Sequence, residues 1–349
     1  MAMMASCYLL LRRANALAPD VTPPARLRRW TGLYLASMAL AHVWYLPLFF
    51  KISSDDILMT DLIGGVLDSM TVFPFSIVIL FAMLQDHRRP LWPIAVLTAP
   101  ITIGMAVCVA IRSDALYPVI YGYVLLMGTG FIIYMVRATR QYGRWLRDNY
   151  ADLEHKEVWQ SFIVLAILLI VYVIYEFTSD GLIYMYAMQV TCVVLICYLL
   201  WRVETLSELS TAVNEAKEEM PEEHTTVAIL SPNIRNNIGL LLKQYCEDQQ
   251  LYLQHDISVM QLAKHIGVNR SYVSKYFALQ GVTYNSYIND LRIQHFIKLY
   301  HEAAVNQQPM AIKQLAYQSG FRSYSTFNAA FKQNMGMTAS EWMHSMRGQ

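Results

Sequence analysis

The chain has 349 residues, 55% of them apolar, and a formal charge of +1 at pH 7. Its mean hydropathy is +0.30. Ordinary soluble proteins have an apolar share of about half or below. The composition therefore argues against a purely water-soluble protein and predicts helices that cross a lipid bilayer.

Six apolar stretches are long enough to cross the hydrocarbon core of a bilayer, which takes about 20 helical residues. They are residues 30–50, 62–84, 91–111, 116–136, 158–178 and 182–201. Residues 1–11 are also apolar but too short to cross unaided, and we expect a seventh, shortened or interfacial helix there. The sequence thus predicts a first segment at 1–29, apolar and then basic, followed by a six-span bundle at 30–203.

The charges in the connecting segments orient this bundle, because Lys and Arg resist translocation across the bilayer. One side carries Arg12, Arg13, Arg26, Arg28, Arg29, Arg88, Arg89, Arg137, Arg140, Arg144, Arg147 and Lys156. The short loops of the other side carry only Lys51 and Arg112. This asymmetry predicts that the N-terminal arginines and the C-terminal region lie together in the cytoplasm.

Three ionisable residues within the predicted spans are candidates for an intramembrane ligand or ion pocket: His42, Asp68 and Glu176. Such groups are costly in lipid and usually face a bundle interior or a cavity. The alternative is a structural role, in which they satisfy one another or neighbouring hydroxyl groups. The five cysteines have neither the spacing nor the histidine partners of a zinc site, so no metal is expected.

An acidic segment, 204–235, follows the last predicted span. Apolar residues at alternating spacings of three and four run from Leu199 to Met220. Such a stripe is typical of a coiled-coil seam and predicts a homodimer through residues 199–220, with a solvated amphipathic linker as the alternative. Pro221 and Pro232 end the predicted helix. Cleavage of this accessible segment, which would release the C-terminal region, is a further hypothesis.

The C-terminal segment, 236–349, has a helical pattern throughout and contains a helix-turn-helix pattern twice. This motif needs a small residue where its two helices meet, a flexible residue in the turn and an apolar anchor in the second helix. The first copy has Ala263, Gly267 and Val273 at these positions, and the second has Ala316, Gly320 and Phe327 with a turn one residue longer. The expected N-caps of the segment are Asp256, Asn269, Thr283 and Thr338. A helix over residues 286–300 joins the copies, and it could hold two recognition helices about one duplex turn apart.

These residues resemble the AraC/XylS-type transcriptional regulators. The resemblance rests on residues 262–277, 287–293 and 315–332, with Gly336-Met337-Thr338 and Glu341-Trp342 similar to the closing segment of that family. It covers the last third of the chain. The chain departs from the family at Ala339, where proline is usual, and at Trp342, where tyrosine is usual. Ala278 and Leu279 also replace polar or basic residues, which affects the expected sequence preference rather than the fold.

The resemblance implies that both recognition helices bind promoter DNA. The outward positions of the first are Arg270, Ser271, Ser274 and Lys275, and those of the second are Arg322, Ser323, Tyr324, Ser325 and Asn328, with Lys332 as a phosphate contact. Arginine can donate two hydrogen bonds to guanine, asparagine can pair with adenine, and serine or lysine can hold phosphate.

The combined prediction is an all-α protein with a polytopic transmembrane bundle and a C-terminal domain that carries two helix-turn-helix motifs. Its expected function is that of a multi-pass transcription regulator of the bacterial inner membrane, with promoter DNA, lipid and RNA polymerase as partners and an unknown signal. No nucleotide-binding or hydrolase signature is present, so neither an enzyme nor a cofactor is predicted. The alternative is a transporter or channel with a regulatory cytoplasmic domain, although Pro47, Pro74 and Pro100 do not form the matched set of broken spans typical of transporters.

Overall fold

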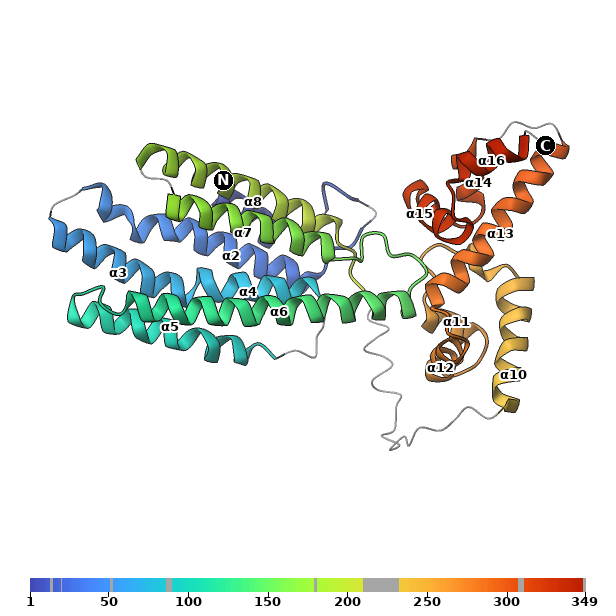
Figure 1. The fold of residues 1–349 in the computed structure, drawn as a ribbon, viewed down its shortest axis with the longest axis horizontal. Helices are drawn as coiled ribbons and strands as arrows, with labels where there is room; N and C mark the ends of the chain where they lie inside the picture. Colours follow the sequence, from blue (N-terminus) through green and yellow to red (C-terminus); the bar gives the residue numbers. More distant parts are fainter. Residues whose placement is uncertain are drawn as a thin grey trace. The chain divides into compact units, whose positions relative to one another are not determined.

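The computed structural model describes residues 1–12, 15–19, 21–50, 53–85, 90–178, 181–209, 232–306 and 311–347. These residues form helices and contain no strand, which confirms the all-α prediction for the described part of the chain (Figure 1). The chain divides into two compact units. The first unit comprises Met1–Gln141 and Val158–Ser210, and the second comprises Tyr142–Glu157 and Thr211–Gln349. The second unit therefore includes a stretch that the sequence assigned to the bundle.

The first unit is built from long apolar helices. They are α1 (Ala2–Leu11), α2 (Ala25–Trp44), η1 (Leu46–Phe49), α3 (Ser54–Met70), α4 (Val72–Met83), α5 (Trp92–Ile111), most of α6 (Tyr117–Asn149), α7 (Trp159–Thr178) and α8 (Gly181–Thr205). Four stretches among the described residues are long and apolar enough to cross a membrane: Ser54–Met83, Trp92–Ile111, Tyr117–Asn149 and Tyr186–Thr205. Ala2–Leu11 and Trp159–Val171 are shorter apolar helices.

Two of the predicted spans are interrupted in the structure, and a proline accounts for each interruption. Helix α2 ends at Trp44 rather than at residue 50, because Pro47 has no N–H to donate to a carbonyl of the preceding turn. The next span is a pair of helices, α3 and α4, which meet at Thr71 three residues before Pro74. Helix α3 begins at Ser54, where the side chain of Ser53 accepts a hydrogen bond from the Asp56 N–H at 3.1 Å.

The expected short helix at the N-terminus is present as α1, and it packs against α2. The Ser6 hydroxyl donates to the carbonyl of Gly32 at 2.8 Å. A Cβ at Gly32 would lie 2.7 Å from Cδ2 of Leu10, so a larger residue there would require the Leu10 side chain to move. Helix α1 is therefore an integral part of the first unit.

Helix α8 ends at Thr205, so the prediction that it continues as one helix through residues 199–220 is wrong. Glu204 is only 2% exposed, and its carboxylate accepts hydrogen bonds from Tyr8 Oη and from the N–H groups of Ala16 and Leu17, the latter two at 3.1 and 3.0 Å. These contacts bind the end of α8 to the N-terminal segment. Leu199 and Leu206 of the proposed seam are buried within the first unit. Residues 210–231, with Met220 and Pro221, lie outside the described residues.

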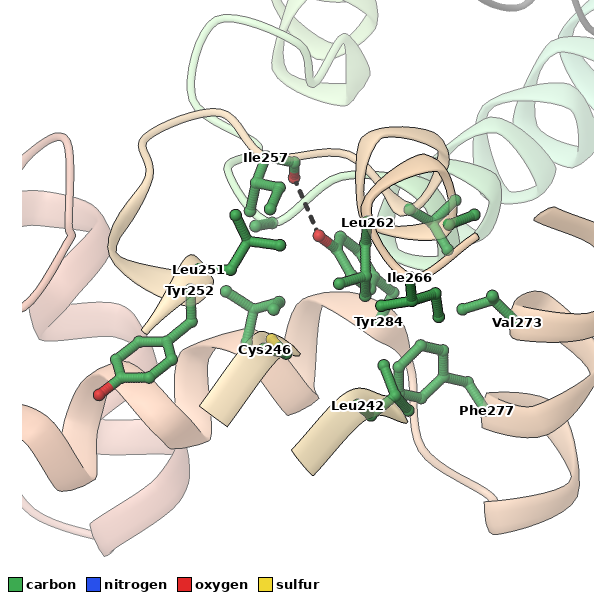
Figure 2. Packing of buried hydrophobic residues seen from close by; sticks show 14 of the residues in the cluster. Leu242, Cys246, Leu251, Tyr252, Ile257, Leu262, Ile266, Val273, Phe277 and Tyr284 are labelled. Carbon is green, nitrogen blue, oxygen red and sulfur yellow. Dashed lines mark hydrogen bonds between the residues drawn. The ribbon is translucent and has the colours of Figure 1, made fainter. Parts of the chain in front are cut away.

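The second unit packs two apolar clusters along one shared helix. Its helices are α10 (Pro232–Leu241), η2 (Leu242–Asp248), η3 (Leu251–Leu253), α11 (Val259–His265), α12 (Arg270–Gln280), α13 (Tyr284–Val305), α14 (Ile312–Gln318), α15 (Tyr324–Met335) and α16 (Ala339–Arg347). Figure 2 shows the first cluster, in which Phe277 of α12 lies beside Leu242 and Val273 of α12 points toward Ile266. Tyr284 Oη donates to the Ile257 carbonyl at 3.3 Å. Ile293 and Phe296 of α13 belong to the second cluster, so α13 supports both cores.

Candidate nucleic-acid interface

The first helix-turn-helix unit consists of α11 and α12. Gly267 in the turn has φ = +68°, a conformation that glycine adopts at the lowest cost. The side chain of Asn269 caps α12 by accepting the Ser271 N–H at 2.8 Å, as the sequence predicts. The expected cap at Asp256 is wrong, because Ser258 caps α11 in a reciprocal capping box with Gln261.

The second helix-turn-helix unit consists of α14 and α15. Its turn, residues 319–323, is one residue longer than the turn at 266–269, as predicted. Ser323 caps α15 by accepting the Thr326 N–H at 3.2 Å. Gly320 has φ = +93°, and a Cβ there would lie 2.8 Å from the Leu253 Cα. The second turn therefore requires glycine both for its conformation and for its close approach to η3.

We expect Gly320→Ala to reduce the free energy of unfolding of the second compact unit by about 2–3 kcal/mol. The alanine would have to adopt a left-handed conformation, and its Cβ would clash with the backbone. Gly267→Ala is the matched control, because a Cβ at Gly267 would meet no atom within 4 Å. Only the conformational cost of about 1 kcal/mol then remains. Thermal unfolding of both full-length variants measures the difference, and equal effects would contradict the role given to the contact with Leu253.

Helix α13 begins at Tyr284 and is capped by Thr283, as predicted. Between the two helix-turn-helix units it carries a buried cation, the side chain of Arg292. Arg292 is 0% exposed. Its Nε donates to the Tyr252 carbonyl at 2.8 Å, and Nη2 donates to the Gln254 carbonyl at 2.9 Å. Nη1 lies 3.3 Å from both carboxylate oxygens of Asp152, which is also buried. A single side chain thus joins α13 and the η3 segment to the segment that follows α6.

The predicted DNA contacts of the first helix-turn-helix unit lie on the first two turns of α12. Ser271 is exposed, and Ser274 and Lys275 are partly exposed. Arg270 is partly exposed and donates from Nη2 to Oδ1 of Asn149, at the end of α6. Tyr272 is also exposed on this helix, beside the predicted contacts, and was not among them.

The predicted DNA contacts of the second helix-turn-helix unit have more varied surroundings. Arg322 forms an ion pair with Asp256. The Ser323 hydroxyl is occupied as the cap of α15, and Tyr324 stacks on Phe327 with ring centroids 5.9 Å apart. Ser325 and Lys332 are exposed, whereas Asn328 is partly buried.

The sequence did not predict that Glu154 and Lys156, in the loop after α6, contact the residues near α15. Glu154 accepts a hydrogen bond from the Thr326 hydroxyl at 3.3 Å, and Lys156 Nζ lies 2.9 Å from Oδ1 of Asp256. Burial alone raises the pKa of Asp256, but the charges of Lys156 and Arg322 outweigh it and hold the pKa below its usual value. Asp256 is therefore ionised at neutral pH. Its partners lie far from it along the chain, so no local pattern could have revealed them.

The intramembrane candidates are not brought together where the structure describes them. Asp68 accepts hydrogen bonds from Trp44 Nε1 at 3.2 Å and Tyr45 Oη at 2.9 Å. His42 is exposed, and its Nδ1 lies 2.9 Å from the Met38 carbonyl of its own helix. The side chain of Glu176 lies outside the described residues. The surroundings of Asp68 fit the structural alternative, in which neighbouring polar groups satisfy the carboxylate. The described residues include no cluster that could hold a metal ion.

The part of the chain that resembles known proteins lies in the second compact unit. A family model described as a helix-turn-helix domain matches residues 262–345. The TCP pilus virulence regulatory protein of Vibrio cholerae is 36% identical over 80 residues, which are 23% of this chain and 27% of that protein. An uncharacterised HTH-type transcriptional regulator of Staphylococcus aureus is 28% identical over 102 residues, which are 29% of this chain and 13% of that protein.

The chain thus matches about a quarter or less of the length of these curated relatives. No solved structure matches it. The match at residues 262–345 covers most of α11 and all of α12, α13, α14 and α15. Residues 262–345 are therefore a helix-turn-helix domain of the AraC type.

Proposed function

We propose that this protein is a membrane-bound, sequence-specific regulator of transcription, in which the apolar helices anchor the chain or sense a signal and the C-terminal domain binds promoter DNA. The observation that carries the proposal is the covalent continuity of four apolar helical stretches of membrane-spanning length with two complete helix-turn-helix units. The inner membrane of a bacterium, with the C-terminal domain in the cytoplasm, is the location that gives such a chain access to the chromosome. RNA polymerase is the expected protein partner at the promoter.

The shared helix supports simultaneous reading by both units. Helix α13 has 22 residues, which corresponds to about 33 Å at a rise of 1.5 Å per residue. One turn of B-form DNA is about 34 Å long, so two recognition helices held along α13 suit successive major grooves on one face of a duplex. The length of α13 thus favours an operator with two half-sites about one turn apart.

The direct test is selection from a library of random-sequence duplexes, using the full-length protein in lipid nanodiscs. We expect a sequence motif to be enriched, and we expect Arg322→Ala to weaken binding to that motif by about 5- to 150-fold if its guanidinium contacts a base. Lys313→Ala is the control, because Lys313 is exposed on α14 and its loss removes the same charge from the same unit. Its effect should be small and independent of sequence. Failure to enrich any motif would contradict the proposed function.

The same preparation tests the alternative function. A transporter or channel in liposomes would move solute or ions at a rate that does not depend on DNA. Robust flux together with no selected motif would favour that alternative over the proposal.

A further inference from the structure

The last residue of α6 and the loop that leads from it to α7 contact the N-terminal ends of both recognition helices. We call residues 149–156 the strap. Its first residue, Asn149, accepts a hydrogen bond from Arg270, the first residue of α12. Its Glu154 accepts a hydrogen bond from Thr326 in the first turn of α15. The strap thus reaches both DNA-binding units at the ends that carry most of the predicted base contacts.

The strap is built into the core of the second unit rather than resting on its surface. The N–H of Ala151 donates to the Ile257 carbonyl at 3.2 Å, and Ala151 is part of the first apolar cluster. The buried Asp152 carboxylate pairs with Arg292 and also accepts the Asp256 N–H at 3.0 Å. Lys156 binds Asp256, the residue that pairs with Arg322. These contacts determine where Asn149 and Glu154 lie.

This arrangement opposes DNA binding in two ways. The N-terminal residues of a recognition helix contact the base edges in helix-turn-helix complexes, and here Arg270 and Arg322 are already engaged within the chain. The carboxylates of Glu154 and Asp256 also lie beside the N-terminal end of α15, where the approach of DNA phosphates would place like charges together.

We infer that the strap is an autoinhibitory element, which occupies the DNA-binding ends of α12 and α15 and must move away before a duplex can bind. The inference rests on the proposed function and adds its regulation. Helix α6 supplies a route for the signal, because it is continuous from Tyr117 in an apolar stretch to Asn149 in the strap. A rotation or shift of this helix would move Asn149 without passing through residues 210–231.

The test compares affinities of full-length proteins in nanodiscs for a random-sequence duplex of about four helical turns. We expect the double variant Asn149→Ala with Glu154→Gln to bind about tenfold more tightly than the wild type, because two in-chain hydrogen bonds no longer compete with DNA. Glu154→Gln alone, at a more exposed position, should give about a threefold gain. Asp148→Asn is the control, since Asp148 is exposed on α6 and its replacement also removes one negative charge. An effect of Asp148→Asn equal to that of Glu154→Gln would overturn the inference.

Amide hydrogen exchange of the wild-type protein separates this inference from the proposed function. We expect the amides of Ala151 and Asp256, both hydrogen-bonded in the strap contact, to be protected without DNA and to exchange faster when the duplex is bound. Binding with these amides still protected would overturn the autoinhibitory role and leave the DNA-binding function intact. If neither the wild type nor the double variant binds any duplex, both the function and its regulation are contradicted.

Discussion

Replacing Arg292 with alanine should lower the free energy of unfolding of the second compact unit by about 3–5 kcal/mol. This is the cost typical of removing one partner of a buried ion pair. The variant leaves the buried carboxylate of Asp152 without its cation and the carbonyls of Tyr252 and Gln254 without their donor. It also removes the guanidinium that lies over the ring of Phe321 at 5.6 Å. Both apolar clusters should be affected, because Arg292 lies between them on α13.

The thiol of Cys246 provides the measurement. It is buried in the first cluster, and burial raises its pKa to about 12, so it should react slowly with alkylating reagents until the unit opens. In a background where Cys7, Cys108, Cys192 and Cys197 are replaced by serine, the labelling rate in increasing urea reports the stability of the unit. Lys298→Ala is the control on the same helix, since its pair with Glu302 is 3.9 Å long and exposed. Its effect should be below about 0.5 kcal/mol, and a similar loss in both variants would contradict the role given to Arg292.

Replacing Phe327 with alanine should cost about 3–5 kcal/mol, because it leaves a cavity at the centre of the second cluster. Phe327 is fully buried on α15, and its ring centroid lies 4.6 Å from that of Phe296, 5.3 Å from Phe321 and 5.5 Å from Phe331. Loss of this ring removes the anchor that holds α15 against α13. We therefore expect α15 to lose its fixed position before α12 does.

Amide exchange resolved along the chain measures this effect. Protection should fall mainly in α14, α15 and α16, while the labelling rate of Cys246 in the first cluster changes less. Tyr317→Ala is the matched control, since Tyr317 is an exposed aromatic residue on α14 of the same unit. If Phe327→Ala leaves protection of α15 unchanged, the second cluster does not depend on this ring as we describe.

The features that follow from local chemistry were predictable from the sequence. Gly267 and Gly320 mark the two turns, and Asn269 and Thr283 cap the helices that they were expected to cap. Each signal lies within a few residues of the structure it specifies, so it survives without knowledge of the rest of the fold. The two helix-turn-helix units were located for this reason.

The features that were missed depend on helix breaks or on distant partners. Hydropathy does not register the end of α2 before Pro47 or the break at Thr71, because apolar residues continue through both. Glu204 begins an acidic run in the sequence, yet its carboxylate is buried against the N-terminal segment. The partner of Asp152 is Arg292, 140 residues further along the chain, and no periodic pattern connects them.

The most direct test of DNA reading by a membrane-bound protein is genome-wide capture of DNA cross-linked to the full-length chain, recovered from the membrane fraction of the cells that produce it. The account predicts discrete promoter sites with a motif of two half-sites about one helical turn apart, and loss of these sites in Arg322→Ala but not in Lys313→Ala. Uniform recovery of DNA without preferred sites, or identical sites in both variants, would contradict it.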